Sequence, residues 1–301
     1  MDWEDWLRAA AKRPSDHEDS KRERTESQIR DALACFEPLN GRPYRVFAKG
    51  SYANNTNVRL NYDVDIAVEY LGYFYSDLMF DLKGKDKSEV GVVSSSDTYS
   101  TGEFKADILA ALEKAFGSSA VTAGNIAYRV RERKTTLPAD VVPSWQYRRY
   151  DKIVNGVPVF QLGCKVFPAK GSPAINYPQQ QLDNGISKNS RTARRYKRMV
   201  RALKKLQTRL VDEGVLDKEL PSYLMECLVY NVPDDKFNHT TYKADMRSVL
   251  ASLFNETLSS GNCQEWHEVN GLKYLFKGER PWTVAEVHTM ASESWDYLGF
   301  E

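Results

Sequence analysis

The sequence contains few of the residues that build disulfide frameworks or zinc sites. It has four cysteines and four histidines in 301 residues. Cys35, Cys164, Cys227 and Cys263 are far apart, and none has the C-x-x-C spacing of zinc ligands. Cys263 and His267 could both ligate a metal, but two ligands without partners make a weak site. We therefore expect four reduced thiols in a cytoplasmic protein.

Long apolar runs and an excess of one charge are also lacking. No apolar run approaches the roughly 20 residues that cross a membrane, and residues 1–27 are charged without the apolar core of a signal peptide. Lys plus Arg is 42 and Asp plus Glu is 41, so the formal net charge is +1. The overall charge therefore does not indicate nucleic-acid binding, and any electrostatic attraction must come from local patches.

Apolar periodicity predicts an α+β fold whose two halves differ. The first half mixes helices with strands, and the second is mostly helical. We predict residues 1–160 as a core that carries a long N-terminal helix, and 161–301 as a helical lobe, in one bilobal unit with the active site between the lobes. The predicted strands are 44–49, 63–70, 121–130, 137–142 and 161–166, and the predicted helices are 19–36, 102–116, 187–212, 221–230, 245–258 and 284–298.

One stretch of the first half suggests chemistry. Gly50-Ser51 is followed after eleven residues by Asp63 and Asp65. On a strand these two side chains share a face, about 7 Å apart, where they repel one another unless a cation intervenes. Mg²⁺ prefers carboxylate and phosphate oxygens. Asp140, between apolar residues on a later predicted strand, would complete the site and accept the proton of an attacking hydroxyl.

Each of these elements has a plainer interpretation when taken alone. An Asp-x-Asp pair on a strand is usually solvated alternation, and Gly-Ser is common in turns. The three elements together, in this order and each in its own strand context, are far more specific. They predict a site in which two metal ions activate a hydroxyl and stabilise a leaving pyrophosphate.

This order of motifs resembles the polymerase-β-like nucleotidyltransferase superfamily. Further segments are similar to the bacterial cGAS/DncV-like nucleotidyltransferases (CD-NTases), and most of all to their CdnE clade. These segments are Gly50-Ser-Tyr-x-x-x-Thr56, Leu137-Pro-Ala-Asp140-Val-Val-Pro, Ile175-Asn-Tyr-Pro178, Asn184-Gly185, Lys188-Asn189-x-x-Thr192, Tyr196-Lys197 and Pro221-Ser-Tyr-x-x-Glu226-Cys-Leu-x-Tyr-Asn231-Val-Pro. They span roughly residues 45 to 235.

The resemblance implies a nucleotidyltransferase core joined to a C-terminal helical lobe. It also implies an enzyme that joins nucleoside triphosphates, here UTP and ATP, into a cyclic dinucleotide and releases pyrophosphate twice. Such products act as second messengers in antiphage (CBASS) defence and are read by a separate effector. We expect a monomer that needs two Mg²⁺ or Mn²⁺ ions and neither a membrane nor double-stranded DNA.

The resemblance also assigns residues by position. Asp63, Asp65 and Asp140 would bind the two metal ions. The remaining positions would contact the nucleotides. Gly50 and Ser51 would hold the donor triphosphate, Lys197 its phosphates, Ser222 the donor nucleotide, and Tyr223 would stack on a base.

Asn176 bears on the choice of base. In pyrimidine-using members of the clade, the matching asparagine contacts the uracil edge, and an amide can donate to O4 and accept from N3–H. The plainer interpretation is that Asn176 only starts the turn before Pro178. We predict UTP at one or both positions, which gives cyclic di-UMP or cyclic UMP–AMP; the sequence does not separate these products.

Residues 188–209 carry ten Lys and Arg side chains. They could form an exposed stripe that binds nucleic acid. They could instead form a solvated helix face that also supplies Lys197 to the triphosphate, which the near-neutral net charge favours.

Two other functions remain open at this stage. An oligonucleotide- or tRNA-end-adding nucleotidyltransferase would use the basic helix to hold an RNA primer. An inactive nucleotide- or RNA-binding module would keep the fold without turnover, although the presence of all three aspartates and of Gly-Ser argues against it.

Overall fold

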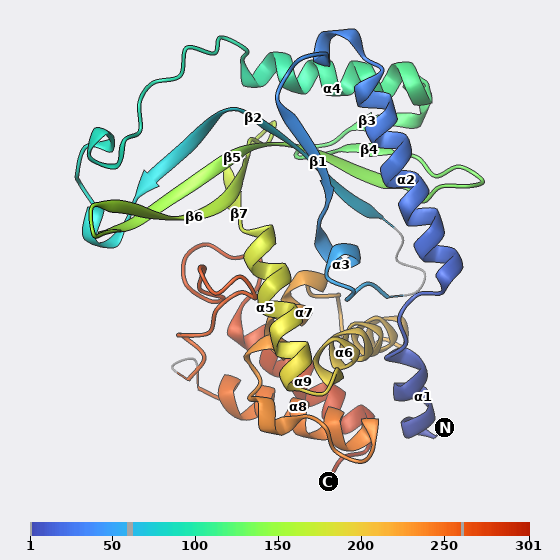
Figure 1. The fold of residues 1–301 in the computed structure, drawn as a ribbon. Helices are drawn as coiled ribbons and strands as arrows, with labels where there is room; N and C mark the ends of the chain where they lie inside the picture. Colours follow the sequence, from blue (N-terminus) through green and yellow to red (C-terminus); the bar gives the residue numbers. More distant parts are fainter. Residues whose placement is uncertain (1, 59–62, 260–261) are drawn as a thin grey trace. The chain divides into compact units, whose positions relative to one another are not determined.

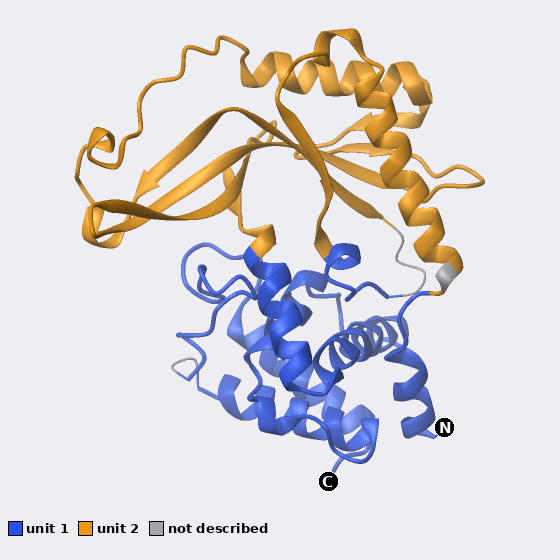
Figure 2. Cartoon of the chain, in the orientation of Figure 1, with its two compact units in different colours: residues 1–14, 51–61, 180–301 blue, residues 15–50, 62–179 orange. Residues whose placement is uncertain are grey.

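The computed structural model describes residues 2–58, 63–259 and 262–301. Its contacts divide the chain into two compact units, shown in Figure 2. Unit 1 comprises residues 1–14, 51–61 and 180–301, and unit 2 comprises residues 15–50 and 62–179. This division differs from the predicted one because two early segments belong with the helical C-terminal part. The predicted boundary after residue 160 lies inside strand β6 (Val157–Val166).

Unit 2 is built on a mixed sheet, which confirms the predicted α+β class. In the described residues the sheet has seven strands, with the order β1-β2-β5-β4-β3 and with β6 and β7 continuing from β5. Strands β2 and β5 are parallel, and the other pairs are antiparallel. The bounds are β1 Tyr44–Ala48, β2 Val64–Leu78, β3 Val121–Ala123, β4 Tyr128–Val130, β5 Ala139–Val154, β6 Val157–Val166 and β7 Ala174–Asn176.

Two strands are much longer than predicted. Strand β2 continues past residue 70 through a bulge between Tyr70 and Phe74, and β5 continues to Val154. Beyond these points both strands carry polar and aromatic side chains that pair with neighbouring strands, so the apolar pattern ends before the strand does. The predicted strand 121–130 is two short strands, β3 and β4, paired through a turn.

Two helices cover one face of this sheet. Helix α2 (Asp16–Ala34) and helix α4 (Thr101–Phe116) lie side by side against it (Figure 1). Each helix begins with a capping box, Ser15 with Glu18 and Ser100 with Glu103, which satisfies N–H groups that the first turn leaves unpaired. Apolar side chains from the helices and the sheet form the core of this unit: Ile29, Leu33, Val68, Phe104, Ile108, Leu112 and Trp145.

Unit 1 is helical, as predicted for the C-terminal part of the chain. Its helices are α1 Trp3–Ala10, α6 Arg195–Asp212, α7 Ser222–Asn231, α8 Tyr242–Thr257 and α9 Val284–Tyr297, together with most of α3 (Gly50–Ala53) and α5 (Pro178–Arg191). One continuous apolar cluster joins α1, α6, α7, α8 and α9, with Met199, Leu203 and Leu228 fully buried. A capping box of Thr283 and Glu286 opens α9.

The predicted helix 187–212 is wrong as a single helix. The chain forms α5 up to Arg191 and α6 from Arg195, because Ala193 and Arg194 both adopt positive φ angles, 46° and 66°. Two other side chains cap the second helix. Thr192 Oγ1 accepts from the Tyr196 N–H, and Asn189 Oδ1 accepts from the Lys197 N–H. No Gly or Pro marks this break in the sequence.

Short 3-10 turns complete the described chain: Glu37–Leu39, Phe80–Leu82, Lys87–Val90, Ser118–Ala120 and Asp234–Lys236. The segment that links β2 to α4 begins at Met79. Among the helices of the described residues, none combines the length and the apolar character that a membrane span requires.

Candidate active site

The carboxylates of Asp65 and Asp140 lie on adjacent parallel strands of unit 2. Asp65 on β2 pairs in register with Asp140 on β5, and Asp140 pairs on its other side with Arg129 on β4. Cross-strand partners point to the same face of a sheet. Asp63, two residues before Asp65, lies just ahead of β2. The strands thus bring together the three aspartates that the sequence places far apart.

The pKa values show that these carboxylates repel one another. Burial is the main reason that the pKa of Asp65 is raised, and the charges of Asp140 and Asp63 add to it, whereas Lys49 opposes it. Burial also raises the pKa of Asp140, with a further contribution from Asp63, whereas Arg129 and Lys49 oppose it. Protonation or a cation would relieve this repulsion.

An arginine neutralises part of this charge. Arg129 Nη2 donates to Asp63 Oδ2 at 2.5 Å. No group of three or more His, Cys, Asp or Glu side chains among the described residues is already arranged around a common metal position. The donor chemistry nevertheless fits a hard divalent cation, because three carboxylates supply only oxygen ligands. Sequence reasoning missed Lys49 and Arg129, which are recognisable only once the strands are paired.

Gly50 fits closely against the Asp65 carboxylate. Its φ is +69°, a left-handed conformation that glycine adopts without strain. A Cβ at this position would overlap the carboxylate, lying 2.9 Å from Asp65 Cγ and closer still to Oδ2. The Lys49 N–H also donates to the Asp65 carbonyl at 2.9 Å. The predicted Gly-Ser turn is therefore fixed to β2, with the half-buried Ser51 following directly in the chain.

Asn176 ends strand β7 in the same unit. It pairs in register with Cys164, and its side chain is exposed. The next residue, Tyr177, is buried, and Pro178 begins α5. Asn176 therefore presents an exposed amide from a position just before a proline turn.

Three other predicted residues lie in unit 1. Lys197 on α6 is 9% exposed, and burial lowers the pKa of its ammonium, which Glu226 opposes. Ser222 is the exposed first residue of α7. The Tyr223 ring is half-buried against the helical core, and its hydroxyl donates to Glu268 Oε2 at 2.9 Å. That bond fixes the orientation of the ring.

Glu226 joins two of the motifs that the sequence analysis quoted. It is buried, and both of its oxygens accept hydrogen bonds, from Thr56 Oγ1 at 2.7 Å and from Gln181 Nε2 at 3.1 Å. Lys204 Nζ donates to the Thr56 carbonyl at 3.0 Å. The segment that follows Gly50-Ser51 is therefore anchored to α6 and α7 by buried polar contacts. The sequence motifs contain Thr56 and Glu226 but assign them no role. Their hydrogen bond shows that they hold this segment against α7.

Comparison with known proteins identifies the family. The model of the cGAS/DncV-like nucleotidyltransferase C-terminal helical domain matches residues 183–299. A cyclic dipyrimidine nucleotide synthase, CdnE, of Cecembia lonarensis is 40% identical over 299 residues, which is 99% of this chain and 98% of that protein. A cyclic dipurine nucleotide synthase of Elizabethkingia meningoseptica is 35% identical and covers 92% of both chains.

A solved structure agrees with these matches. The CdnE c-UMP-AMP synthase of Rhodothermus marinus, solved with Apcpp and Upnpp, superposes with a TM-score of 0.82 at 30% identity, over 98% of this chain and 95% of that one. The predicted family and fold are confirmed. The chain therefore belongs to the CdnE clade of the cGAS/DncV-like nucleotidyltransferases, and it is a cyclic dinucleotide synthase.

Proposed function

We propose that this enzyme uses UTP at one or both positions of its cyclic dinucleotide, with Asp63, Asp65 and Asp140 as its catalytic residues. The observation that carries the catalytic assignment is the in-register pairing of Asp65 with Asp140 beside Gly50. This arrangement holds two carboxylates on one face of the sheet, with the Asp65 carboxylate packed against the Gly50 backbone.

The family typically uses divalent metals. Asp63, Asp65 and Asp140 would hold two Mg²⁺ or Mn²⁺ ions, which when bound neutralise developing charge on the attacking and leaving oxygens. For Asp63 this requires Arg129 to give up the Oδ2 contact that it makes in the described structure. Asp140 accepts the proton of the attacking sugar hydroxyl, and burial raises the pKa of its carboxyl, which makes the carboxylate a stronger base.

The other residues hold the nucleotides. Gly50 and Ser51 present backbone N–H groups and a hydroxyl to the donor triphosphate. Lys197 contributes an ammonium as a point charge for the phosphates, and Ser222 contacts the donor nucleotide. Tyr223 stacks on a base, which is worth roughly 1–3 kcal/mol per base. Its ring is already oriented by Glu268, so little conformational entropy is lost on binding.

The choice of base rests on Asn176 and on the relatives. The exposed amide of Asn176 can donate to uracil O4 and accept from N3–H. The Cecembia relative is a dipyrimidine synthase and the Rhodothermus relative a c-UMP-AMP synthase, whereas the Elizabethkingia relative is a dipurine synthase. We therefore propose cyclic di-UMP and cyclic UMP–AMP as the candidate products.

Mass spectrometry of the products from mixed ATP, GTP, CTP and UTP, with Mg²⁺ or Mn²⁺, tests this proposal. We expect a phosphatase-resistant product that contains uridine, because a cyclic product has no terminal phosphate. Incorporation of purines alone would refute the pyrimidine assignment. Linear, phosphatase-sensitive products that form only with an RNA primer would favour the end-adding alternative. The variant Asp63→Asn with Asp65→Asn is the control, and it should lose all turnover.

A further inference from the structure

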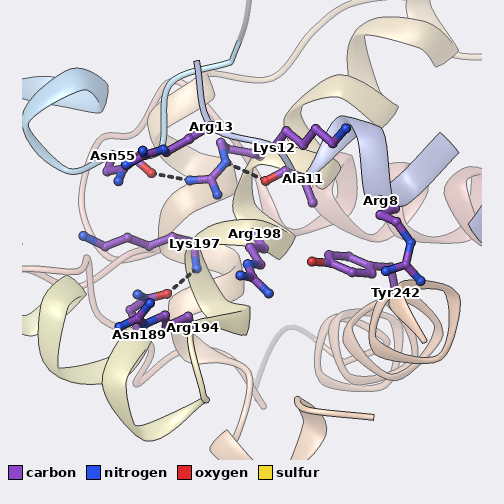
Figure 3. Close-up of a pocket in the computed structure, with 11 residues that line it drawn as sticks. Arg8, Ala11, Lys12, Arg13, Asn55, Asn189, Arg194, Lys197, Arg198 and Tyr242 are labelled. Carbon is purple, nitrogen blue, oxygen red and sulfur yellow. Dashed lines mark hydrogen bonds between the residues drawn. The ribbon is translucent and has the colours of Figure 1, made fainter. Parts of the chain in front are cut away.

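Unit 1 contains a cavity of about 750 Å³ whose lining includes Lys197 but no other residue assigned to the substrates (Figure 3). It is bordered by α1, by the segment after α3, by the junction of α5 with α6, and by the start of α8. The lining residues are Arg8, Ala11, Lys12, Arg13, Asn55, Asn189, Arg194, Lys197, Arg198, Arg201 and Tyr242. Seven of these eleven are cationic, two are amides, and none is acidic.

Buried hydrogen bonds hold the walls of this cavity in place. Arg201, 6% exposed, donates to the Ala11 carbonyl at 2.9 Å and to the Asn55 carbonyl at 2.5 Å. These bonds join three separate stretches of the chain around one buried guanidinium. Neutral carbonyls satisfy its hydrogen bonds but leave its positive charge uncompensated.

The cations in this cavity repel one another. The pKa of Arg201 is lowered to about 10, chiefly by burial and then by the charges of Arg198 and Arg13. Within the described part of the chain, Lys12, Arg194 and Arg198 form no ion pair with an acidic side chain, whereas Arg8 pairs with Glu4. A bound anion would relieve this repulsion.

The rest of the basic helix is used within the protein. Lys188 and Arg191 both pair with Asp234, and Arg195 pairs with Asp245. Lys204 is buried on a backbone carbonyl, and Arg209 pairs with Glu213. The ten basic side chains of residues 188–209 therefore do not form one exposed stripe. Its uncompensated charges gather in the cavity, which favours a compact anion over an extended nucleic acid.

Lys197 lines the cavity and is also assigned to the donor triphosphate. In Figure 3 its side chain extends away from Arg198 and Tyr242, so that its ammonium lies on the opposite side of the view from Arg8. The Lys197 ammonium thus points in a different direction from the Arg198 guanidinium. Lys12, Arg194 and Arg198 are not among the residues assigned to the substrates.

We propose that this cavity is a second anion site, which binds a compact molecule carrying two or more phosphate groups. Its volume lies within the roughly 300–1,000 Å³ of small-molecule sites. Guanidinium groups hold phosphate through paired N–H donors, and the amides of Asn55 and Asn189 add neutral contacts. The occupant is either an inorganic polyphosphate or the triphosphate of a nucleotide, since both offer the same chemistry.

Isothermal titration of the full-length chain tests this proposal, with metal ions removed and with inorganic tripolyphosphate as the probe. The variant Lys12→Ala with Arg198→Ala removes two cavity charges at exposed or half-buried positions. The control variant, Arg24→Ala with Arg131→Ala, removes two exposed charges from unit 2. We expect the cavity variant to weaken tripolyphosphate binding by at least about tenfold, and the control by less than about twofold. A non-cleavable nucleoside triphosphate analogue, titrated in the same way, distinguishes the two sources.

Several results would overturn the proposal. One is equal weakening of tripolyphosphate binding in the cavity and control variants. Another is loss of binding in Lys197→Ala while the cavity variant still binds, which would place the anion in the donor site. A third is binding of single-stranded RNA without binding of tripolyphosphate or nucleotide. None of these measurements requires turnover, so the result is independent of the base choice proposed above.

Discussion

At the scale of single residues, the fit between Gly50 and Asp65 is the tightest constraint in the proposed active site. A left-handed backbone and a carboxylate in contact with the missing side chain both require glycine there. The sequence indicated a Gly-Ser turn but not the carboxylate that Gly50 faces. That neighbour depends on how the turn is fixed to β2, which no local pattern encodes.

Replacing Gly50 can separate the effect of its left-handed backbone from the effect of its contact with Asp65. We expect Gly50→Ala to lower kcat/KM by about 100-fold or more, because the added methyl group displaces the Asp65 carboxylate. The control is Gly41→Ala, which has a similar φ of +73° with nothing within 4 Å of the new methyl group. Both variants should lose about 1–2 kcal/mol of stability from backbone strain. Unchanged pyrophosphate release by Gly50→Ala would contradict the proposed geometry.

The buried carboxylate of Asp65 should lower the stability of the folded protein. Because folding raises its pKa, the folded protein binds a proton there more tightly than the unfolded chain does. The cost of the ionised carboxylate is therefore complete above the folded pKa, and it disappears as the pH falls through that value toward the unfolded pKa of about 3.9. In the absence of metal, Asp65→Asn should thus be more stable than the wild type near neutral pH, while losing turnover.

Calorimetry without divalent metal checks this expectation. At about pH 7.5 we expect the Tm of Asp65→Asn to exceed that of the wild type by roughly 2 °C, and the difference to shrink as the pH is lowered. Asp217→Asn, at an exposed position, is the matched control and should leave the Tm unchanged. A lower Tm for Asp65→Asn at neutral pH would show that the carboxylate stabilises the fold instead.

At the scale of elements, periodicity predicted the existence of most helices and strands but not their ends. Strand β5 keeps a buried face through Trp145, Tyr147 and Tyr150, where arginines and lysines interrupt the apolar pattern. The break between α5 and α6 comes from positive φ angles at Ala193 and Arg194, residues that usually continue a helix. In both places tertiary contacts override local preference, which explains why the sequence alone could not reveal them.

The bond between Thr56 and Glu226 is a contact between elements that substitution can test. Glu226→Ala would leave the buried Thr56 hydroxyl and Gln181 amide without their acceptor. Breaking a buried charged contact costs about 3–5 kcal/mol. Chemical denaturation should show a loss of this size, with a smaller loss for Glu226→Gln, which keeps one acceptor oxygen. Glu219→Ala, at an exposed position, should change stability by less than about 0.5 kcal/mol.

At the scale of the whole molecule, the net charge is close to zero, but the charged side chains are unevenly distributed. The net charge is +1, yet one cavity gathers seven cations and the proposed catalytic site gathers three carboxylates. The sequence singled out the three aspartates and the basic residues of 188–209, but not Arg8, Lys12 and Arg13 near the N-terminus. It could not show which of the basic side chains pair internally, because Asp234 lies 46 residues after Lys188 and Asp245 lies 50 residues after Arg195.

This distribution predicts the response to nucleic acid. Because most cations of α6 are paired or buried, we expect double-stranded DNA to change the rate of cyclic product formation by less than about twofold at physiological salt. Product formation measured with and without duplex checks this expectation, with Lys12→Ala plus Arg198→Ala as a comparison. Activity strictly dependent on the duplex would mean that the unpaired charges serve a polymer.

The chain passes back and forth between its two units, and this limits how chimeras of such enzymes can be made. Residues 51–61 belong with 180–301, and the Thr56–Glu226 bond holds them there. A chimera that exchanges only the C-terminal segment with a relative of different base preference would combine a foreign Glu226 environment with the resident Thr56. Transplanting unit 1 intact therefore means exchanging three stretches of gene together, 1–14, 51–61 and 180–301, and the crossover after Gly50 falls within the Gly-Ser motif itself.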